Sequence, residues 1–581
     1  MNNTNRMKQL ITEHLAIWTT APKGIKKLRE LILELAVRGL LVPQEANDEP
    51  ASALLKKIAA EKARLVSEGK IKPPKPLAKI SEEEKPFDLP MGWEWERLRN
   101  FSVLKGGFAF QSTEFTNTGS HQVIRMGNIR PNYLRLNENS VFITPEYADN
   151  TQEYKIELND ILLTMTGTKG KRDYLYSLVI NSEDIQERSL YLNQRLCIVR
   201  SIICNSEFIN MVIKSDIILD VIYSKSTGTA NQANIGIDAL NNWIIPLPPL
   251  AEQQRIVAKV DELMQLCDQL EEKQSGSQAM HRQLVSCLLT TLTEATDAQA
   301  FQAAWSRIAA NFDCLFTTEH SIEQLKQTIL QLAVMGKLVP QNPNDEPASE
   351  LLKKIATEKA RLITEGKIKK QNPLPKISEQ EKPFALPDSW EWAYLADLMA
   401  LITDGDHQSP TKSNSGIPFL VIGNLNTGRI NFSGCRFVTE EYFNNLDWSK
   451  KPLKNDILYT VTGSYGIPIT VTTNEPFCVQ RHVAIFKVTN SSPQRYLSAI
   501  LASKYVLNYS TNIATGIAQK TVPIIGLRKM PIPLPPLPEQ HRIVAKVDEL
   551  MALCEQLKTK LILSKTLQQQ LAETLVQQAV A

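Results

Sequence analysis

A long internal duplication constrains this chain more than any other feature of its sequence. Residues 246–271 read PLPPLAEQQRIVAKVDELMQLCDQLE and residues 533–558 read PLPPLPEQHRIVAKVDELMALCEQLK, so 21 of 26 positions are identical. A second pair of matching blocks begins at Leu35 and at Leu332, and each runs on to a segment with two tryptophans, GWEW or SWEW. A repeat of this length predicts two copies of one architecture, related by a pseudo-two-fold axis.

Each copy contains a variable region, at roughly 100–245 and 397–532, in which a shared frame is still visible. DILLTMTGT at Asp160 matches DILYTVTGS at Asp456, and NQRLCIVR at Asn193 matches VQRHVAIFK at Val479. Short β-branched and aromatic runs between Gly, Asn and Ser turns predict strands. Loops that vary on a constant scaffold are where specificity usually lies.

The PLPP blocks predict long helices, because prolines suit only the first turn and apolar residues then recur every three or four positions. These apolar positions are Ile256, Val260, Leu263, Cys267 and Leu270 in the first copy, and Ile543, Val547, Leu550, Cys554, Leu557 and Leu561 in the second. Each stripe is too narrow to be buried alone, so we expect the two helices to pack on each other in antiparallel fashion. We interpret the two cysteines as small buried hydrophobic residues rather than redox groups.

The blocks that contain NDEPAS and EKARL also predict helices, with Pro50 and Pro347 in the first turn and Gly69 and Gly366 after the last. Their Lys and Glu residues form either a solvated face or a docking surface for a partner. The predicted fold is α+β, with two α/β domains joined by two long antiparallel, coiled-coil-like helices. The expected segments are 1–95 (helical segment and linker), 96–248 (first domain), 249–295 (central helix), 296–392 (repeated helical segment and linker), 393–535 (second domain) and 536–581 (C-terminal helix).

Composition excludes several classes of protein. The 65 basic and 62 acidic residues give a net charge of +3, so bulk charge does not hold this chain to DNA, and it is not an acidic disordered chain. No apolar stretch approaches about 18 residues, which argues against a transmembrane helix. Eight cysteines without a CxxC pair argue against a disulfide scaffold or a zinc ribbon and favour a reducing cytoplasm.

Motifs for catalysis are missing from the sequence. We find no GxxxxGK[ST] phosphate loop, no GxGxxG after a strand, no HExxH and no N/D-P-P-Y/F motif of amino-methyltransferases. The absence favours a chain with no chemistry of its own, although a divergent site is left open.

The duplicated PLPPLxEQxRIVAKVDEL blocks, with variable domains between them, closely resemble the specificity subunit of type I restriction–modification systems, in its longer-chain branch. The resemblance covers nearly the whole chain. It implies a non-catalytic, cytoplasmic protein of a bacterium or archaeon, in which each variable region is a target recognition domain for half of an asymmetric bipartite DNA sequence. The helices would set the spacing and dock two modification (adenine methyltransferase) subunits, and two restriction subunits, which are translocases with a nuclease, would join. No cofactor is expected on this chain, since S-adenosylmethionine, ATP and Mg²⁺ would belong to the partners.

Two alternatives from other classes stay open. A self-sufficient DNA methyltransferase or nuclease would bind S-adenosylmethionine or cleave DNA without partners. A freestanding DNA-binding or scaffold protein would lack neighbouring modification and restriction genes.

Candidate DNA contacts are polar residues in turn-like places, because Arg or Lys pairs with guanine and Asn or Gln with adenine. They are Gln111, Lys169, Lys171, Arg172, Tyr174, Gln194 and Arg195 in the first region, and Asp406, His407, Gln408, Ser464, Tyr465, Gln480, Arg481 and His482 in the second. Thr229, Asn231, Gln232, Gln519 and Lys520 follow later Thr-Gly pairs in the same way.

Plainer readings of these residues are also open. The Thr-Gly pairs suit ordinary hairpin turns, the Gln-Arg pairs suit solvated strand ends, and 169–172 suits phosphate contacts. Trp93, Trp95, Trp390 and Trp392 are interpreted as packing anchors rather than base-stacking platforms. The first region has 13 basic and 15 acidic residues and the second 13 and 8, so we expect the partners to supply much of the grip on DNA.

Overall fold

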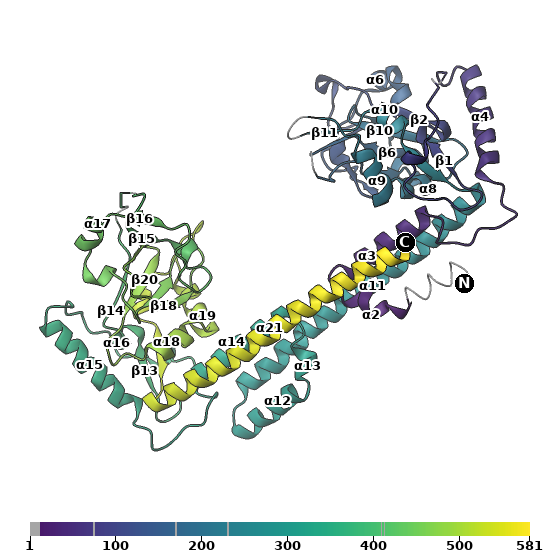
Figure 1. Cartoon of the computed structure of the whole chain (residues 1–581). Helices are drawn as coiled ribbons and strands as arrows, with labels where there is room; N and C mark the ends of the chain where they lie inside the picture. The colour runs from purple at the N-terminus through teal and green to yellow at the C-terminus, as the bar shows by residue number, and fades with distance from the viewer. Residues whose placement is uncertain are drawn as a thin grey trace. The chain divides into compact units, whose positions relative to one another are not determined.

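The computed structural model describes residues 12–73, 76–168, 171–228, 232–407, 410–411 and 413–580. The chain forms two compact units, Met1–Ser277 with Ser564–Ala581, and Gln278–Leu563. Each unit holds one variable domain, one helical segment and a part of each of two long helices (Figure 1). The duplication seen in the sequence is therefore a duplication of folded units.

The first domain is closed by its own ends, because its first strand pairs antiparallel with its last, Trp95 opposite Pro246. Its main sheet has four antiparallel strands in the order β2-β10-β6-β8, and β3 pairs in parallel with β9. The strands are β1 (Glu94–Arg97), β2 (Ser102–Gly106), β3 (His121–Ile124), β4 (Ile129–Arg130), β5 (Tyr133–Leu134), β6 (Ile161–Thr164), β7 (Thr166–Gly167), β8 (Ser177–Val179), β9 (Ser189–Leu192), β10 (Leu196–Ser201), β11 (Ala233–Asn234) and β12 (Ile244–Leu247).

Helices complete the first unit. They are α2 (Leu15–Thr20), α3 (Gly24–Val37), α4 (Ala51–Ser67), α5 (Leu98–Phe101), α6 (Pro145–Asn150), α7 (Ser182–Ile185), α8 (Ser206–Val212), α9 (Asp216–Tyr223) and α10 (Ile237–Asn241). Buried residues of α3, α8, α9 and one face of the main sheet form one apolar core. The other face of the sheet packs in a smaller core that includes Leu162 and Ile198.

The second domain repeats this topology. Its end strands pair with Trp392 opposite Pro533, and its main sheet has the order β14-β20-β17-β18. The strands are β13 (Glu391–Tyr394), β14 (Leu401–Asp404), β15 (Ile417–Leu420), β16 (Arg436–Val438), β17 (Ile457–Thr460), β18 (Pro468–Thr470), β19 (Cys478–Val479), β20 (Val483–Lys487) and β21 (Pro531–Leu534). The helices are α12 (Ala298–Ala310), α13 (Phe312–Leu315), α14 (Glu319–Val334), α15 (Ala348–Thr364), α16 (Leu395–Leu398), α17 (Glu440–Asn445), α18 (Gln494–Leu501), α19 (Lys504–Ile513) and α20 (Ile524–Arg528).

The two long helices are α11 (Leu250–Glu294) and α21 (Leu537–Val580). Helix α11 begins in the first unit and ends in the second, whereas α21 begins in the second and ends in the first, so they run antiparallel. With 45 residues, α11 is about 68 Å long at 1.5 Å per residue. The predicted central helix over 249–295 agrees with these bounds, although Ser275-Gly276-Ser277 is a poor helix former. The helix continues because Val285, Leu289 and Leu292 are buried farther on.

The two predicted apolar stripes do not face each other. Ile256, Val260 and Cys267 pack in the core of the first unit, on α3 and on Ala572 and Leu575 near the end of α21. Their counterparts Ile543, Val547 and Cys554 pack in the second unit, on α14 and on Val285, Leu289 and Leu292 near the end of α11. Leu263 and Leu270, and Leu550, Leu557 and Leu561, lie half-buried on the same cores. In an antiparallel pair, the start of one helix lies beside the end of the other. Matching the two helix starts in the sequence does not reveal this arrangement.

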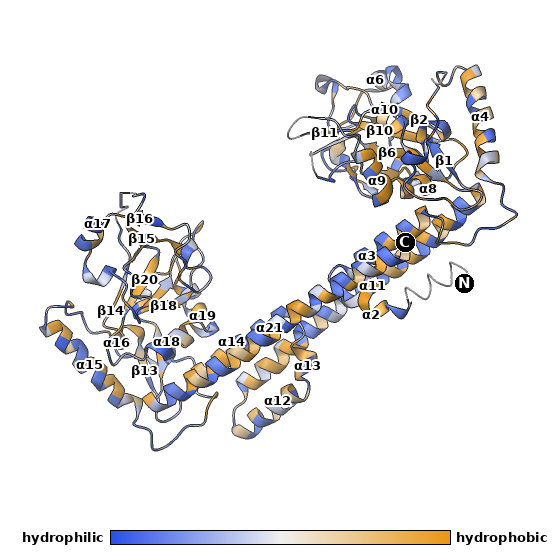
Figure 2. Cartoon of the chain, viewed as in Figure 1, coloured by the Kyte–Doolittle hydropathy of each residue, from blue (hydrophilic) through white to orange (hydrophobic). Residues whose placement is uncertain are grey.

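One lysine of each EKARL helix bonds to a backbone carbonyl of its domain, and apolar residues of both helices are buried in the cores. The Lys62 ammonium on α4 donates to the carbonyl of Ser102 (3.1 Å), and Lys359 on α15 donates to that of Ala396 (2.7 Å). Burial lowers the pKa of Lys62 to about 8. Figure 2 shows hydrophobic and hydrophilic residues side by side along α4 and α15, and most of their other charges are exposed. The helices are therefore amphipathic, with a solvated outer face.

A buried carboxylate joins each long helix to its helical segment and domain. The Trp93 indole donates to Glu252 Oε2 (3.0 Å) and the Gln44 amide to Glu252 Oε1 (3.0 Å). In the second unit Trp390 (3.1 Å) and Gln341 (3.0 Å) donate to Glu539 in the same way. Both carboxylates are almost completely buried, and burial raises their pKa. The interpretation of Trp93 and Trp390 as packing anchors is confirmed.

We predict that Trp390→Phe lowers the free energy of unfolding by about 2 kcal/mol, because it leaves the buried Glu539 carboxylate without one of its donors. Trp93→Phe should cost about the same. Denaturant unfolding followed by circular dichroism measures both. Trp305→Phe is the matched control, since that indole is 39% exposed. A loss no larger than that of the control would show that the indole–carboxylate bond is unimportant.

Candidate DNA interface

Four loops of the first domain lie together because backbone hydrogen bonds link them in series. Phe108 N donates to Leu192 O (2.9 Å), which joins the loop after β2 to the end of β9. Met165 N donates to Arg195 O (3.1 Å), which joins the turn after β9 to the loop after β6. That loop continues as β7, which pairs with β11. The predicted polar loops therefore meet at one edge of the domain.

The second domain builds the same edge. Gly405 N donates to Val483 O (3.2 Å), and Val461 N donates to His482 O (3.0 Å). Gly463 N donates to Lys520 O (3.0 Å), which joins the loop after β17 to the one after α19. The two Thr-Gly segments of each variable region thus contact each other, although more than 50 residues separate them in the sequence.

Strand register corrects one match made from the sequence. Leu196 pairs with Thr164 in the first domain and Val483 with Thr460 in the second, and these two threonines are equivalent. Arg195 is therefore equivalent to His482, not to Arg481. The three-residue turn after β9 reads Asn193-Gln194-Arg195, and its counterpart reads Gln480-Arg481-His482. The shared letters Gln-Arg lie one residue out of register, because letter matching ignores strand pairing.

A glycine lies directly beneath each of these turns. A Cβ on Gly107 would come 1.9 Å from Asn193 O, and one on Gly405 would come 2.1 Å from Val479 O. Neither space admits a side chain, so both positions depend on glycine for close backbone approach. The sequence analysis missed these two residues, and the signal for them is a glycine after the first strand of each sheet.

Several of the candidate residues already bind other side chains of this protein. Arg172 forms ion pairs with Asp216 (2.6 Å) and Asp220 on α9. Tyr174 is 4% exposed, and its hydroxyl bonds to Ser226 Oγ (3.0 Å). These two residues stabilise the loop and are poorly placed to contact bases.

Candidate residues of the second domain also bind other side chains of this protein. Asp406 accepts from the Tyr442 hydroxyl (2.8 Å) and from the Lys450 ammonium (2.9 Å). His407 Nε2 lies 2.9 Å from Asp404 Oδ2. Tyr465 is half-buried and donates to Thr511 Oγ1 (3.2 Å).

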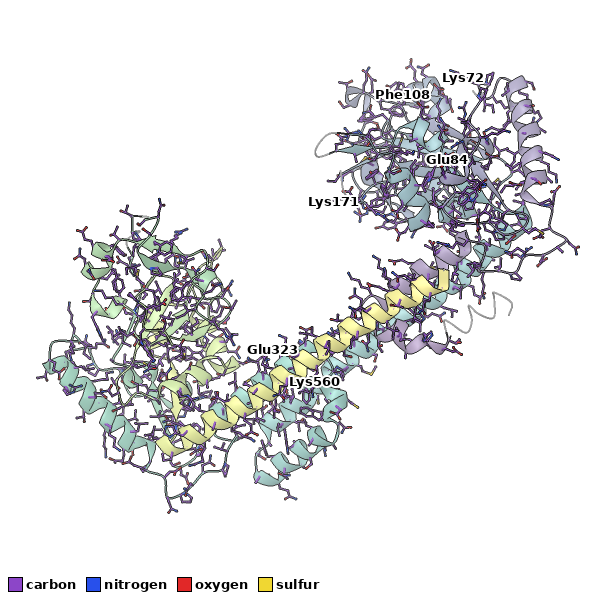
Figure 3. The ribbon with its side chains drawn as sticks, in the orientation of Figure 1. Lys72, Glu84, Phe108, Lys171, Glu323 and Lys560 are labelled. Atoms are coloured by element: carbon purple, nitrogen blue, oxygen red, sulfur yellow. The ribbon has the colours of Figure 1, made fainter. Side chains whose placement is uncertain are left out.

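Most of the remaining candidate residues are exposed to solvent. Gln111, Lys171, Gln194, Arg195, Ser464 and Arg481 are exposed, and among the described residues their side chains have no recorded hydrogen bond or ion pair. Figure 3 shows Lys171 at the rim of the first domain, on the far side from Lys72. Gln480 and His482 are half-buried, and burial together with the charge of Arg481 lowers the pKa of His482, which favours the neutral imidazole. Lys169 and Gln408, with Thr229 and Asn231, lie outside the described residues.

The repeated motifs of the frame are structural. Asn128 and Asn424 of the Gly-Asn pairs bond to backbone carbonyls seven residues on (3.0 Å each). Asp160 is bound by Arg200 (2.7 Å), and Asp456 by the buried Lys487 ammonium (2.5 Å). Burial raises the pKa of Asp456 and lowers that of Lys487, and the charge of each partner opposes the shift of the other.

Comparison with known proteins agrees with this geometry. The family model described as type I restriction modification DNA specificity domain matches residues 90–277 and 387–564. The EcoAI type I restriction enzyme specificity subunit of Escherichia coli is 37% identical, over 99% of this chain and all of the relative, and its EcoEI counterpart gives the same values. The chain belongs to the family of type I restriction–modification specificity subunits.

A solved HsdS subunit from Thermoanaerobacter tengcongensis is 18% identical, and the match covers 85% of this chain and 98% of that one at a TM-score of 0.41. Membership of the specificity-subunit family makes this chain a DNA sequence-recognition subunit rather than an enzyme in its own right. In the described part of the chain, no cluster of three or more His, Cys, Asp or Glu residues is arranged to hold a metal ion. No described helix is both long and apolar enough to cross a membrane.

We predict that Gly107→Ala weakens DNA binding by this specificity subunit at one half of its target, because the added methyl group would displace the turn at 193–195. Gly405→Ala should act on the other half. Gly127→Ala and Gly423→Ala are matched controls, since a Cβ at either position meets nothing within 4 Å. Electrophoretic mobility shift with DNA mutated in each half measures the effect. Equal behaviour of the tested and control variants would show that the turns do not need this support.

Proposed function

We propose that each variable domain recognises one half of an asymmetric bipartite DNA target, and that α11 and α21 fix the gap between the halves. The observation that carries the proposal is the loop edge, which is built twice on the same frame with different side chains. Equivalent positions in the two turns, Gln194 and Arg481 for example, offer different hydrogen-bonding groups. Two equal frames with unequal contacts suit two unequal half-sites.

We further propose that the candidate residues that are open on these edges contact DNA, while partner subunits perform the chemistry in the cytoplasm. On this view S-adenosylmethionine, ATP and Mg²⁺ are bound by two modification and two restriction subunits and not by this chain. The near balance of charge in both variable regions supports a shared grip on the phosphates.

Exposed leucines on the long helices support partner docking. In the first unit Leu266 of α11 is 46% exposed, and Leu571 of α21 is 46% exposed. Their repeat equivalents in the second unit, Leu553 and Leu284, are 48% and 52% exposed. Large apolar side chains exposed at equivalent positions of both copies are typical of an interaction surface used twice, which fits two modification subunits.

The experiment that tests the function is a genome-wide map of methylated adenines in cells that express this chain with its neighbouring modification subunit, and in cells that express either alone. We expect a split, asymmetric motif only when both are present. Methylation by this chain alone would show a catalytic site on it. A complete absence of DNA binding by the assembled proteins would contradict the proposal.

Exchange of residues 100–245 for another variable domain is predicted to change one half of the methylated motif and leave the other half unchanged. The reason is that strand pairing between β1 and β12 closes the domain on itself. Exchange of 397–532 serves as the reciprocal control. A change in both halves after one exchange would contradict independent domains.

A four-residue insertion in the middle of α11, matched by one in α21, is predicted to change the gap between the half-sites and not their bases. About one helical turn is added to each helix, so both keep their buried faces. The same methylation map measures the gap. An unchanged gap would show that the helices do not set the spacing.

Leu266→Asp and Leu553→Asp are predicted to weaken binding of the modification subunit by ten-fold or more, because a charge replaces an apolar contact. Size-exclusion chromatography of the mixed proteins measures assembly. Thermal unfolding of the lone subunit should not change, because both side chains are exposed. Retained assembly with both variants would place the docking surface elsewhere.

A further inference from the structure

The two turns at 193–195 and 480–482 are held by the same set of backbone hydrogen bonds. Four backbone hydrogen bonds hold each turn, and all four are equivalent in the two domains. At the start of the first turn Asn193 N donates to Ile124 O (3.1 Å), and at its end Leu196 N donates to Asn193 O (3.0 Å). The corresponding bonds in the second domain are Gln480 N to Leu420 O and Val483 N to Gln480 O, both 3.0 Å.

The other two bonds connect each turn to its neighbouring loops. Arg195 O accepts from Met165 N (3.1 Å), and Leu196 O accepts from Gly107 N (3.0 Å). In the second domain His482 O accepts from Val461 N and Val483 O accepts from Gly405 N. The backbone of a glycine, Gly107 or Gly405, lies in close contact with the turn, so the turn cannot move toward the interior of the domain. A backbone fixed in this way presents its side chains at a defined position, as recognition of base edges requires.

The chemistry on this shared backbone differs between the domains. The first turn carries Asn, Gln and Arg, and the second carries Gln, Arg and His, position by position. Asn193 Oδ1 accepts from Gln194 N (2.6 Å) within the turn, so Gln194 and Arg195 are the exposed groups of the first turn and Arg481 that of the second. Amide and guanidinium groups are those that pair bidentately with adenine and guanine. Contacts to phosphate carry no sequence information, so two half-sites of different sequence require different side chains at the positions that read bases.

Competing candidates on the same edges are less suitable. Arg172 is held by two carboxylates of α9, and Asp406 by Tyr442 and Lys450. In contrast, the exposed side chains of Gln194, Arg195 and Arg481 have no recorded partner among the described residues. They are therefore available without breaking an internal ion pair.

We propose that the turns 193–195 and 480–482 are the base-reading elements of the two domains, each specifying bases in its own half-site. The proposal rests on the proposed function and adds to it the residues that determine specificity. It predicts that the identity of three residues, on an otherwise unchanged domain, alters the bases recognised in one half of the target.

The experiment exchanges the turns in the full chain, co-expressed with its modification subunit. One variant carries Asn193→Gln, Gln194→Arg and Arg195→His, and the other carries Gln480→Asn, Arg481→Gln and His482→Arg. Methylation mapping in cells and binding-site selection with the purified complex give the preferred motif. We expect each variant to change one or two bases of one half-site and to lose about ten-fold or more of its binding to the original half-site. The other half and the gap should not change.

The matched control introduces the same residue types at the opposite end of β9. Gln186→Arg with Glu187→His changes two exposed positions that precede this strand, and should leave the motif as it is. An unchanged motif in both turn variants would overturn the proposal. So would a uniform loss of affinity for all DNA with a shallower salt dependence, which is the behaviour of a phosphate contact. Thermal unfolding of each variant separates misfolding from lost recognition, and if one exchange unfolds its domain, the reciprocal exchange decides the question.

An unexchanged chain that directs no bipartite methylation with its partner would instead contradict the proposed function itself. That result is distinct from a turn variant that methylates the original motif.

Discussion

The buried carboxylate at the start of each long helix is the interaction on which the rest of the structure depends. Glu252 and Glu539 each accept hydrogen bonds from a tryptophan next to the first strand of the domain and from a glutamine within the helical segment of the same unit. A carboxylate in a buried place is costly unless donors surround it. Because the carboxylate and its two donors come from three parts of the chain, this one requirement fixes helix, domain and helical segment to each other within each unit.

The pairing of the first and last strands of each domain complements this connection. Since β1 pairs with β12 and β13 with β21, each variable domain enters and leaves the frame at one place. The proposed recognition loops can then differ between the two domains without disturbing the helices. This arrangement explains how a duplicated frame can carry two different recognition surfaces, and why we expect exchange of one domain to affect one half-site.

In the proposed function, recognition within each domain depends on a fixed backbone beneath variable side chains. The glycines at 107 and 405 let a turn rest directly on the neighbouring loop, and the strands on either side define its position. Some polar residues that stand out in the sequence serve the loops instead, as Arg172 does with its two carboxylates. Polar character alone therefore does not separate residues that support the interface from residues that face DNA.

Several features followed from the sequence because they depend on local patterns. Proline before a stripe of apolar residues indicated both long helices, and the doubled blocks indicated two copies of one α+β architecture with an antiparallel helix pair. The duplication was also visible in the PLPP blocks, since 21 identical positions of 26 are far more than chance gives, and the same blocks carried the resemblance to the family. The clustering of the Thr-Gly loops was not predicted, because loops distant in the sequence meet through the sheet.

The sequence by itself determined the helices, because periodicity and proline act over neighbouring residues. It also determined the duplication, through the repeated blocks, and the kind of protein, through the resemblance of those blocks to a known family. Tertiary structure alone decided the partners of each helix and the register of the recognition turns. Ile256 packs near Leu575 rather than near Ile543, since antiparallel helices bring opposite ends together. Arg195 is equivalent to His482 rather than to Arg481, since hydrogen-bonded strand pairing, and not the likeness of letters, sets which residue occupies which place.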